Sequence, residues 1–165
     1  MVDVSRAIVI RDASSDDEPA IDDLSRSAFE ELRRIYRPSQ AALSGKAALD
    51  VALSRIVAVG GRDDIIGTVQ YRVEAPRLHL IGLAVHPTHR KIGVARRLVD
   101  HLAELARRRS LGCISLYAVK ETGNPAVFER LGFRSIRTQP ADWCLGVEPM
   151  TEVYMERDAR RVSYL

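Results

Sequence analysis

The chain has 165 residues, of which 46% are apolar and 28% charged, a composition that supports a buried core and argues against a fibrous or disordered protein. Its formal net charge is only +3, because 25 basic residues are scattered among 22 acidic ones, so nucleic acid is not an expected partner. Two distant cysteines exclude a disulfide framework, and no apolar run is long enough to cross a membrane, so we expect a single cytoplasmic domain over residues 1–165.

The first third of the sequence predicts one strand followed by two helices. A β-branched run at Ala7–Ile10 is typical of a short strand. Between Ala20 and Tyr36, apolar residues recur at helical spacing, which predicts an amphipathic helix that Pro38 ends. The apolar positions are Ile21, Leu24, Ala28, Leu32 and Ile35. The alanine-rich stretch Gln40–Leu53 predicts a second helix.

The middle of the sequence predicts three strands and then a long helix. The strands are expected at Arg55–Val59, Ile65–Glu74 and Leu78–Val85, and the short turns between them indicate an antiparallel meander. The segment Val94–Arg109 has apolar residues on one helical face and charged residues on the other, and Gly112 follows it. This pattern is the clearest helical signal in the protein.

The last third alternates between strands and a helix. Strands are predicted at Ile114–Val119, Phe133–Arg137 and Thr151–Arg157, and a short helix at Pro125–Leu131. Strands and helices thus alternate through the second half of the chain, which indicates an α/β (α+β) fold.

The junction between the strand that ends at Val85 and the following helix predicts an anion site. The first N–H groups of a helix have no partner within it, and the helix dipole also favours negative charge there. Small residues at Gly93 and Ala95 would let phosphate oxygens approach the backbone, while Arg90 and Lys91 would add cations. The stretch lacks the Gly-Lys-Ser/Thr and three-glycine signatures of common nucleotide loops, so it predicts a different diphosphate ligand. A turn that only packs the helix closely on the sheet is the structural alternative.

Three blocks of sequence, in chain order, carry a family resemblance. They read Leu83-Ala84-Val85-His86-Pro87, then Arg90-Lys91-Ile92-Gly93-Val94-Ala95, then Asn124-Pro125-Ala126-Val127-Phe128-Glu129-Arg130-Leu131-Gly132-Phe133. The second block fits the pattern Arg or Gln, two residues, Gly, one residue, Gly or Ala. Together the blocks resemble the GNAT family of acyl-CoA N-acyltransferases, closely over the middle third of the chain and more loosely elsewhere.

This resemblance implies a fold and a cofactor site. The fold would be a mixed, mostly antiparallel sheet of about seven strands, flanked by helices on both faces. Main-chain groups near the end of the third meander strand would hold the thioester and pantetheine arm of acetyl-CoA, and the helix start would hold its pyrophosphate. The implied cofactor-binding residues are Leu83, Ala84, Val85, Arg90, Lys91, Ile92, Gly93, Val94, Ala95, Arg96, Asn124 and Phe128.

The sequence departs from the family pattern at the catalytic positions. Phe128 stands where many members have a tyrosine that protonates the leaving thiolate, and Leu116–Val119 lacks the glutamate base of some members. A CoA thiol is acidic enough to leave without that tyrosine, so the reaction is weakened and not excluded. We nominate Glu74 and His79 as bases that act through water, and Tyr117 as a substitute acid. For His79, a hydrogen-bonded structural role is the alternative.

The sequence therefore predicts an N-acetyltransferase that moves an acetyl group from acetyl-CoA to a primary amine of a small molecule or protein, in a ternary complex. The expected partners are acyl-CoA and an amine, with no metal, nucleic acid or membrane, and a homodimer stays open. One alternative is an inactive GNAT-like module that senses acyl-CoA or binds a partner. Another is a metal-dependent vicinal-oxygen-chelate enzyme, for which duplicated modules and His/Glu ligands are not evident.

Overall fold

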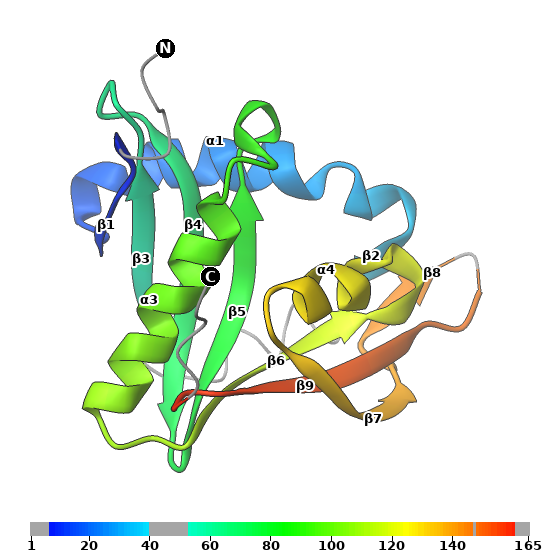
Figure 1. Cartoon of the computed structure of the whole chain (residues 1–165). Coiled ribbons are helices and arrows are strands. Elements are labelled where there is room, and N and C mark those ends of the chain that lie inside the picture. The colour runs from blue at the N-terminus through cyan, green and yellow to red at the C-terminus, as the bar shows by residue number, and fades with distance from the viewer. Residues whose placement is uncertain (1–6, 40–52, 147, 161–165) are drawn as a thin grey trace.

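The computed structural model describes residues 7–39, 53–146 and 148–160, and these form a seven-stranded sheet and a separate two-stranded sheet (Figure 1). The large sheet has the order β1-β3-β4-β5-β6-β9-β7. Its strands are β1 (Val9–Asp12), β3 (Ser54–Val59), β4 (Ile65–Glu74), β5 (Arg77–Val85), β6 (Cys113–Val119), β7 (Arg134–Pro140) and β9 (Thr151–Asp158). The pair β5–β6 is parallel and the other pairs are antiparallel, which confirms the predicted mixed, mostly antiparallel sheet.

Helices lie on both faces of the large sheet, as predicted. They are α1 (Glu18–Phe29), α3 (Val94–Arg108) and α4 (Asn124–Arg130), with short 3₁₀ turns η2 (Ser15–Asp17), η3 (Leu32–Arg34), η4 (Pro87–His89) and η5 (Lys120–Thr122). Figure 1 shows α3 in front of the sheet and α1 behind it. No helix of the described residues is long and apolar enough to cross a membrane.

Alternation along the strands explains why both faces of the sheet are covered. On β3, Ile56 belongs to the core cluster that includes Leu98 of α3, whereas its neighbour Val57 belongs to a cluster with Ile21 of α1. Successive strand side chains point to opposite faces, so an apolar run such as the one on β3 needs an apolar helix on each side. The apolar stripes of α1 and α3 provide these two layers.

The parallel strands β5 and β6 pair only over a short length. Arg77–His79 of β5 pairs with Cys113–Ser115 of β6, and the two strands then separate (Figure 1). Along the other edge of β5 the pairing with β4 shifts register near Gly82, whose φ of +63° is a conformation that glycine adopts easily. The chain therefore reaches Val85 with one strand edge turned away from β6.

The prediction that the first helix continues to Tyr36 is wrong. The helix α1 ends at Phe29, and the chain then forms η3 and a strand β2 (Tyr36–Pro38), which pairs with β8 (Cys144–Gly146). Ile35 and Tyr36 pack in a second apolar cluster with Trp143, whose ring is 5.6 Å from that of Tyr36. Tertiary packing, and not helical periodicity, explains these apolar positions. Apart from Leu53, the helix predicted for Gln40–Leu53 lies outside the described residues.

A glycine on β4 lets the first turn of α3 lie directly on the sheet. A Cβ atom at Gly67 would lie 2.6 Å from Cγ1 of Val94 and 3.1 Å from Cδ1 of Leu98. Both are core side chains with almost no exposed surface. We expect Gly67→Ala to lower the free energy of unfolding by about 1–3 kcal/mol, because the added methyl overpacks this contact. Chemical denaturation measures the change.

The matched control for this prediction is Gly61→Ala in the turn after β3. A Cβ atom there would have Cβ of Ala7 as its nearest neighbour, at an ordinary 3.6 Å. Equal denaturation midpoints for the two variants would contradict the close approach of α3 to β4.

Candidate active site

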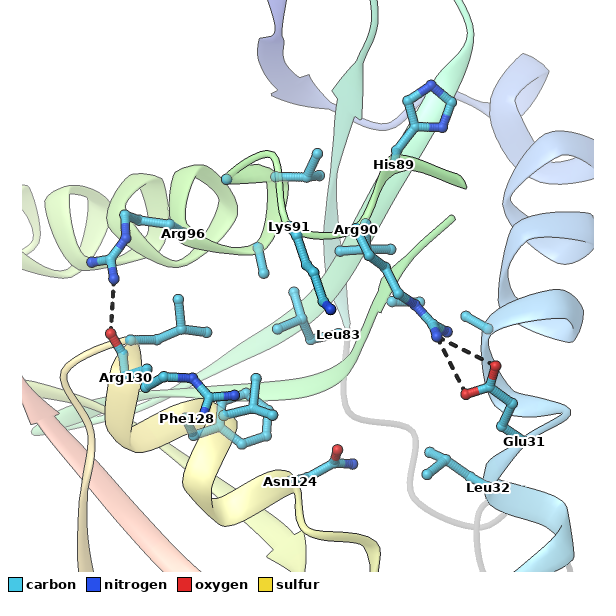
Figure 2. Close-up of a pocket in the computed structure, with 18 of the residues that line it drawn as sticks. Glu31, Leu32, Leu83, His89, Arg90, Lys91, Arg96, Asn124, Phe128 and Arg130 are labelled. Carbon is cyan, nitrogen blue, oxygen red and sulfur yellow. Dashed lines mark hydrogen bonds and ion pairs between the residues drawn. The ribbon is translucent and has the colours of Figure 1, made fainter. Parts of the chain in front are cut away.

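A cavity of about 570 Å³ opens where β5 separates from β6. Its walls are the end of β5, the loop from η4 into α3, one side of α4, and the C-terminal end of α1 with η3 (Figure 2). Every residue that the sequence analysis implied for cofactor binding lines this cavity, except Ile92. The three sequence blocks, which lie far apart along the chain, are thus brought to one place.

The loop from β5 into α3 presents backbone amides to the cavity. After β5, the amide of His86 donates to the carbonyl of Ile66 at 2.9 Å, which anchors the start of the loop on β4. Gly93 is the N-cap residue of α3 and has a φ of +87°. Because a glycine cap has no side chain, it cannot occupy the N–H groups of the first helical turn, which have no intrahelical partner. These groups are available to an anion.

Basic side chains surround these amides. Arg90, Lys91, Arg96 and Arg130 all line the cavity, and Figure 2 shows Lys91 extending from the loop toward its centre. Nη2 of Arg96 donates to the carbonyl of Arg130 at 2.8 Å, so the first turn of α3 is tied to the end of α4. The combination of helix N-terminus and cations suits a diphosphate.

The remaining wall of the cavity is apolar. Leu83, Val85 and Phe128 line it and also pack against the main core. The Phe128 ring stands edge-on to that of Phe133 at 5.8 Å, which fixes its place on α4. An apolar channel beside an anion site suits a long uncharged arm attached to a phosphate. The phenyl ring carries no proton that it could donate.

The three nominated catalytic groups do not line this cavity. Glu74 forms an ion pair with Arg72 at the far end of β4. His79 is buried on β5, with its Nδ1 2.9 Å from Oγ of Ser115, and its ring lies 5.5 Å from that of Tyr117. The structure thus brings His79 and Tyr117 together, with Glu74 close enough for its charge to act on the His79 imidazole. His79 precedes Val85 by six residues, which is roughly 20 Å along a strand.

The cysteines lie away from the cavity. Both Cys113 and Cys144 are free, and burial raises the pKa of each thiol. Neither lines the cavity. Over residues 7–39, 53–146 and 148–160, no group of three or more His, Cys, Asp or Glu side chains is arranged to hold a metal ion.

Three residues on the wall that α1 contributes were not among the site residues named from the sequence. Phe29, Glu31 and Leu32 line the cavity opposite the α3 loop. Of these, only Leu32 belongs to the apolar helical stripe, and a stripe does not say which cavity a residue lines. Arg130 and His89, to which the sequence analysis gave no role, also line the cavity.

Comparisons with known proteins agree with this geometry. A model of the Acetyltransferase (GNAT) family matches residues 18–133. A streptothricin acetyltransferase from Streptomyces lavendulae is 37% identical over 81 residues, which cover 47% of this chain and only 42% of that protein. The crystal structure of a nourseothricin acetyltransferase has a TM-score of 0.70 at 21% identity, over 93% of this chain and 99% of that one. The crystal structure of PaiA N-acetyltransferase from Thermoplasma acidophilum, in complex with coenzyme A, has a TM-score of 0.68 at 13% identity. The match covers 92% of this chain and 99% of that one.

The helix cap provides a direct test of the anion site. We expect Gly93→Ala to weaken binding of coenzyme A by about tenfold or more, because an alanine disfavours a positive φ and the first amides of α3 would turn away. Isothermal titration calorimetry measures the affinity. Gly123→Ala is a matched control, since Gly123 also has a positive φ of +76° and open space around its Cβ position. Equal losses in both variants would show that strain alone is responsible.

Buried His79 predicts a pH dependence of stability. Burial lowers the pKa of His79, and nearby Arg72 acts in the same direction. The unfolded chain therefore binds a proton more readily than the folded one, so stability is complete above about pH 6.5 and falls below it. We expect His79→Asn to flatten the fall in melting temperature between pH 7.5 and 5.5, and His101→Asn, at an exposed position, to leave it unchanged. An unchanged slope in His79→Asn would contradict this assignment.

Proposed function

Because the chain belongs to the acetyltransferase (GNAT) family, we propose that it transfers an acetyl group from acetyl-CoA to a primary amine, by direct attack within a ternary complex. The observation that carries this proposal is the cavity at the divergence of β5 and β6. It combines an anion site at the start of α3 with an apolar channel beside an open strand edge. Acetyl-CoA has a part that suits each feature: a diphosphate for the anion site, a long arm for the apolar channel, and a thioester for the open strand edge.

The residues of the cavity have distinct roles in holding the cofactor. The amides of Val94–Arg96, with Lys91 and Arg90, hold the pyrophosphate. The apolar wall that includes Phe128 lies along the pantetheine arm, and Asn124 contributes a side-chain amide at the start of α4. Main-chain groups of Leu83–Val85 pair with the amides of the arm, as an added strand pairs with a sheet edge.

Positioning provides most of the catalysis in this proposal. The neutral amine attacks the thioester carbon, the carbonyl oxygen becomes an oxyanion beside the N–H groups of β5, and the carbon–sulfur bond then breaks. The amine loses a proton, and the leaving thiolate takes one from water or from the departing ammonium. Holding the reactants in line and placing N–H groups at the oxyanion provide much of the barrier reduction.

Tyr117 is our proposed acid for the leaving thiolate. It lies on β6, the strand that diverges from β5, it is 41% exposed, and its hydroxyl accepts a hydrogen bond from Nη2 of Arg137 at 3.1 Å. We expect Tyr117→Phe to lower kcat by about ten- to a hundredfold, the low end for general acids because a CoA thiolate leaves readily, with CoA affinity unchanged. Steady-state kinetics of the Tyr117→Phe variant measures the change in kcat.

The same assay applies to the proposed bases. Glu74→Gln and His79→Asn should each lower kcat if these groups accept the proton of the amine through water. Unchanged turnover in any of the three variants removes that residue from the catalytic assignment.

We propose a small-molecule amine as the acceptor. This proposal rests on the relatives described above, which are named for streptothricin and nourseothricin. A panel of streptothricin, spermidine and a short peptide with a free N-terminus separates an antibiotic, a polyamine and a protein acceptor. Release of CoA thiol with acetyl-CoA reports the reaction for each amine.

The proposed function predicts two results with the wild-type protein. Calorimetry should give an affinity for coenzyme A in the micromolar range, and thiol release should exceed the rate of hydrolysis with streptothricin. Absence of CoA binding would contradict the whole proposal. Binding without acetyl transfer to any amine of the panel would favour the inactive acyl-CoA-binding module.

We also propose that the protein works in the cytoplasm, without metal, nucleic acid or membrane partners. The small net charge of +3 and the two free cysteines support this proposal. Light scattering of the purified protein would distinguish a monomer from a homodimer.

A further inference from the structure

One acidic side chain lies in a cavity that is otherwise basic. Among the described residues that line the cavity, Glu31 is the one carboxylate, and it shares the lining with several cations. These cations are Arg90, Lys91, Arg96 and Arg130. A carboxylate within reach of a diphosphate site opposes binding of the ligand. Its presence at this position therefore needs an explanation.

Glu31 forms an ion pair across the mouth of the cavity. Nη1 of Arg90 lies 3.2 Å from Oε2 and 3.4 Å from Oε1 of Glu31, although the two residues are 59 positions apart in the chain. Figure 2 shows Arg90 reaching from the α3 loop and Glu31 from the end of α1, so that the pair joins two opposite walls. Arg90 is thus engaged with a carboxylate of the protein itself.

The pair is of a kind that a ligand can replace. The side chains of Arg90 and Glu31 are 39% and 66% exposed, and water screens such a pair strongly. A diphosphate carries more negative charge than a carboxylate, and the amides at the start of α3 bind it at the same time. A diphosphate bound at the start of α3 is therefore able to replace Glu31 as the partner of Arg90.

We propose that Glu31 is an internal competitor of the diphosphate for Arg90, and that it thereby sets the affinity for coenzyme A. This inference rests on the proposed function. Binding of the diphosphate to Arg90 requires the Arg90–Glu31 pair to break. The free energy of this step offsets part of the attraction, so coenzyme A binds more weakly than it would if Glu31 were absent. After acetyl transfer, Glu31 recovers Arg90 and helps to expel the CoA product. A binding site tuned in this way releases its product faster.

A double-mutant cycle tests the competition. Affinities for coenzyme A are measured by calorimetry at low salt for the wild type, Glu31→Gln, Arg90→Gln and the double variant. We expect Glu31→Gln to tighten binding about two- to fivefold, as expected from loss of an exposed ion pair. In the Arg90→Gln background the same change should have less than half of this effect, because the contested cation is absent.

The control is Glu30→Gln at the preceding, exposed position, which has the same charge change and does not line the cavity. It should leave CoA affinity within measurement error. Thermal unfolding of each variant identifies any that is misfolded. The difference in CoA affinity between the wild type and Glu31→Gln should shrink at high salt, because salt screens the charges.

Several results would overturn the inference. Unchanged or weaker binding in Glu31→Gln would show that Glu31 does not compete for Arg90. An equal gain in the Arg90→Gln background would show that Glu31 repels the diphosphate directly, and an equal gain in Glu30→Gln would indicate general electrostatics. Failure of the wild type to bind coenzyme A at all would instead contradict the proposed function, and this inference with it.

Discussion

The structure depends on one close contact, that of the first turn of α3 with β4. Gly67 leaves room for Val94 to rest directly on the sheet, and Gly93 turns the chain into the helix with a positive φ. Together they fix the helix N-terminus beside the end of β5, beyond the short stretch in which β5 pairs with β6. Backbone amides that are positioned by packing need no reorganisation when an anion arrives, which is the general advantage of preorganised sites.

Other elements meet at this point and complete the site. α4 is tied to the first turn of α3 through Arg96 and the carbonyl of Arg130, and α1 reaches the same loop through Glu31 and Arg90. The cavity is therefore bounded by elements from the first, middle and last thirds of the chain. Among the described residues that line it, a helix N-terminus, several cations and one carboxylate set its electrostatic character.

The sequence predicted the parts of the protein whose signals are local. The meander, the α3 helix and the tight loop that leads into it follow from periodicity and from Arg90, Gly93 and Ala95, because each requires residue types at short spacing. The predicted end of the first helix was wrong, because Ile35 keeps the helical period but packs with Trp143 in a different cluster. The wall containing Glu31 and the separation of His79 from the cavity depend on how distant segments meet, and local patterns carry no such information. The roles of the nominated catalytic groups stay predictions.

The central claim is that the first amides of α3 bind the diphosphate of coenzyme A. Titration of ¹⁵N-labelled protein with coenzyme A, followed by NMR, observes these amides directly. The account predicts that the signals of Val94, Ala95 and Arg96 shift together and saturate with the affinity found by calorimetry. Saturable binding that leaves these three amides unmoved and shifts signals elsewhere would contradict it.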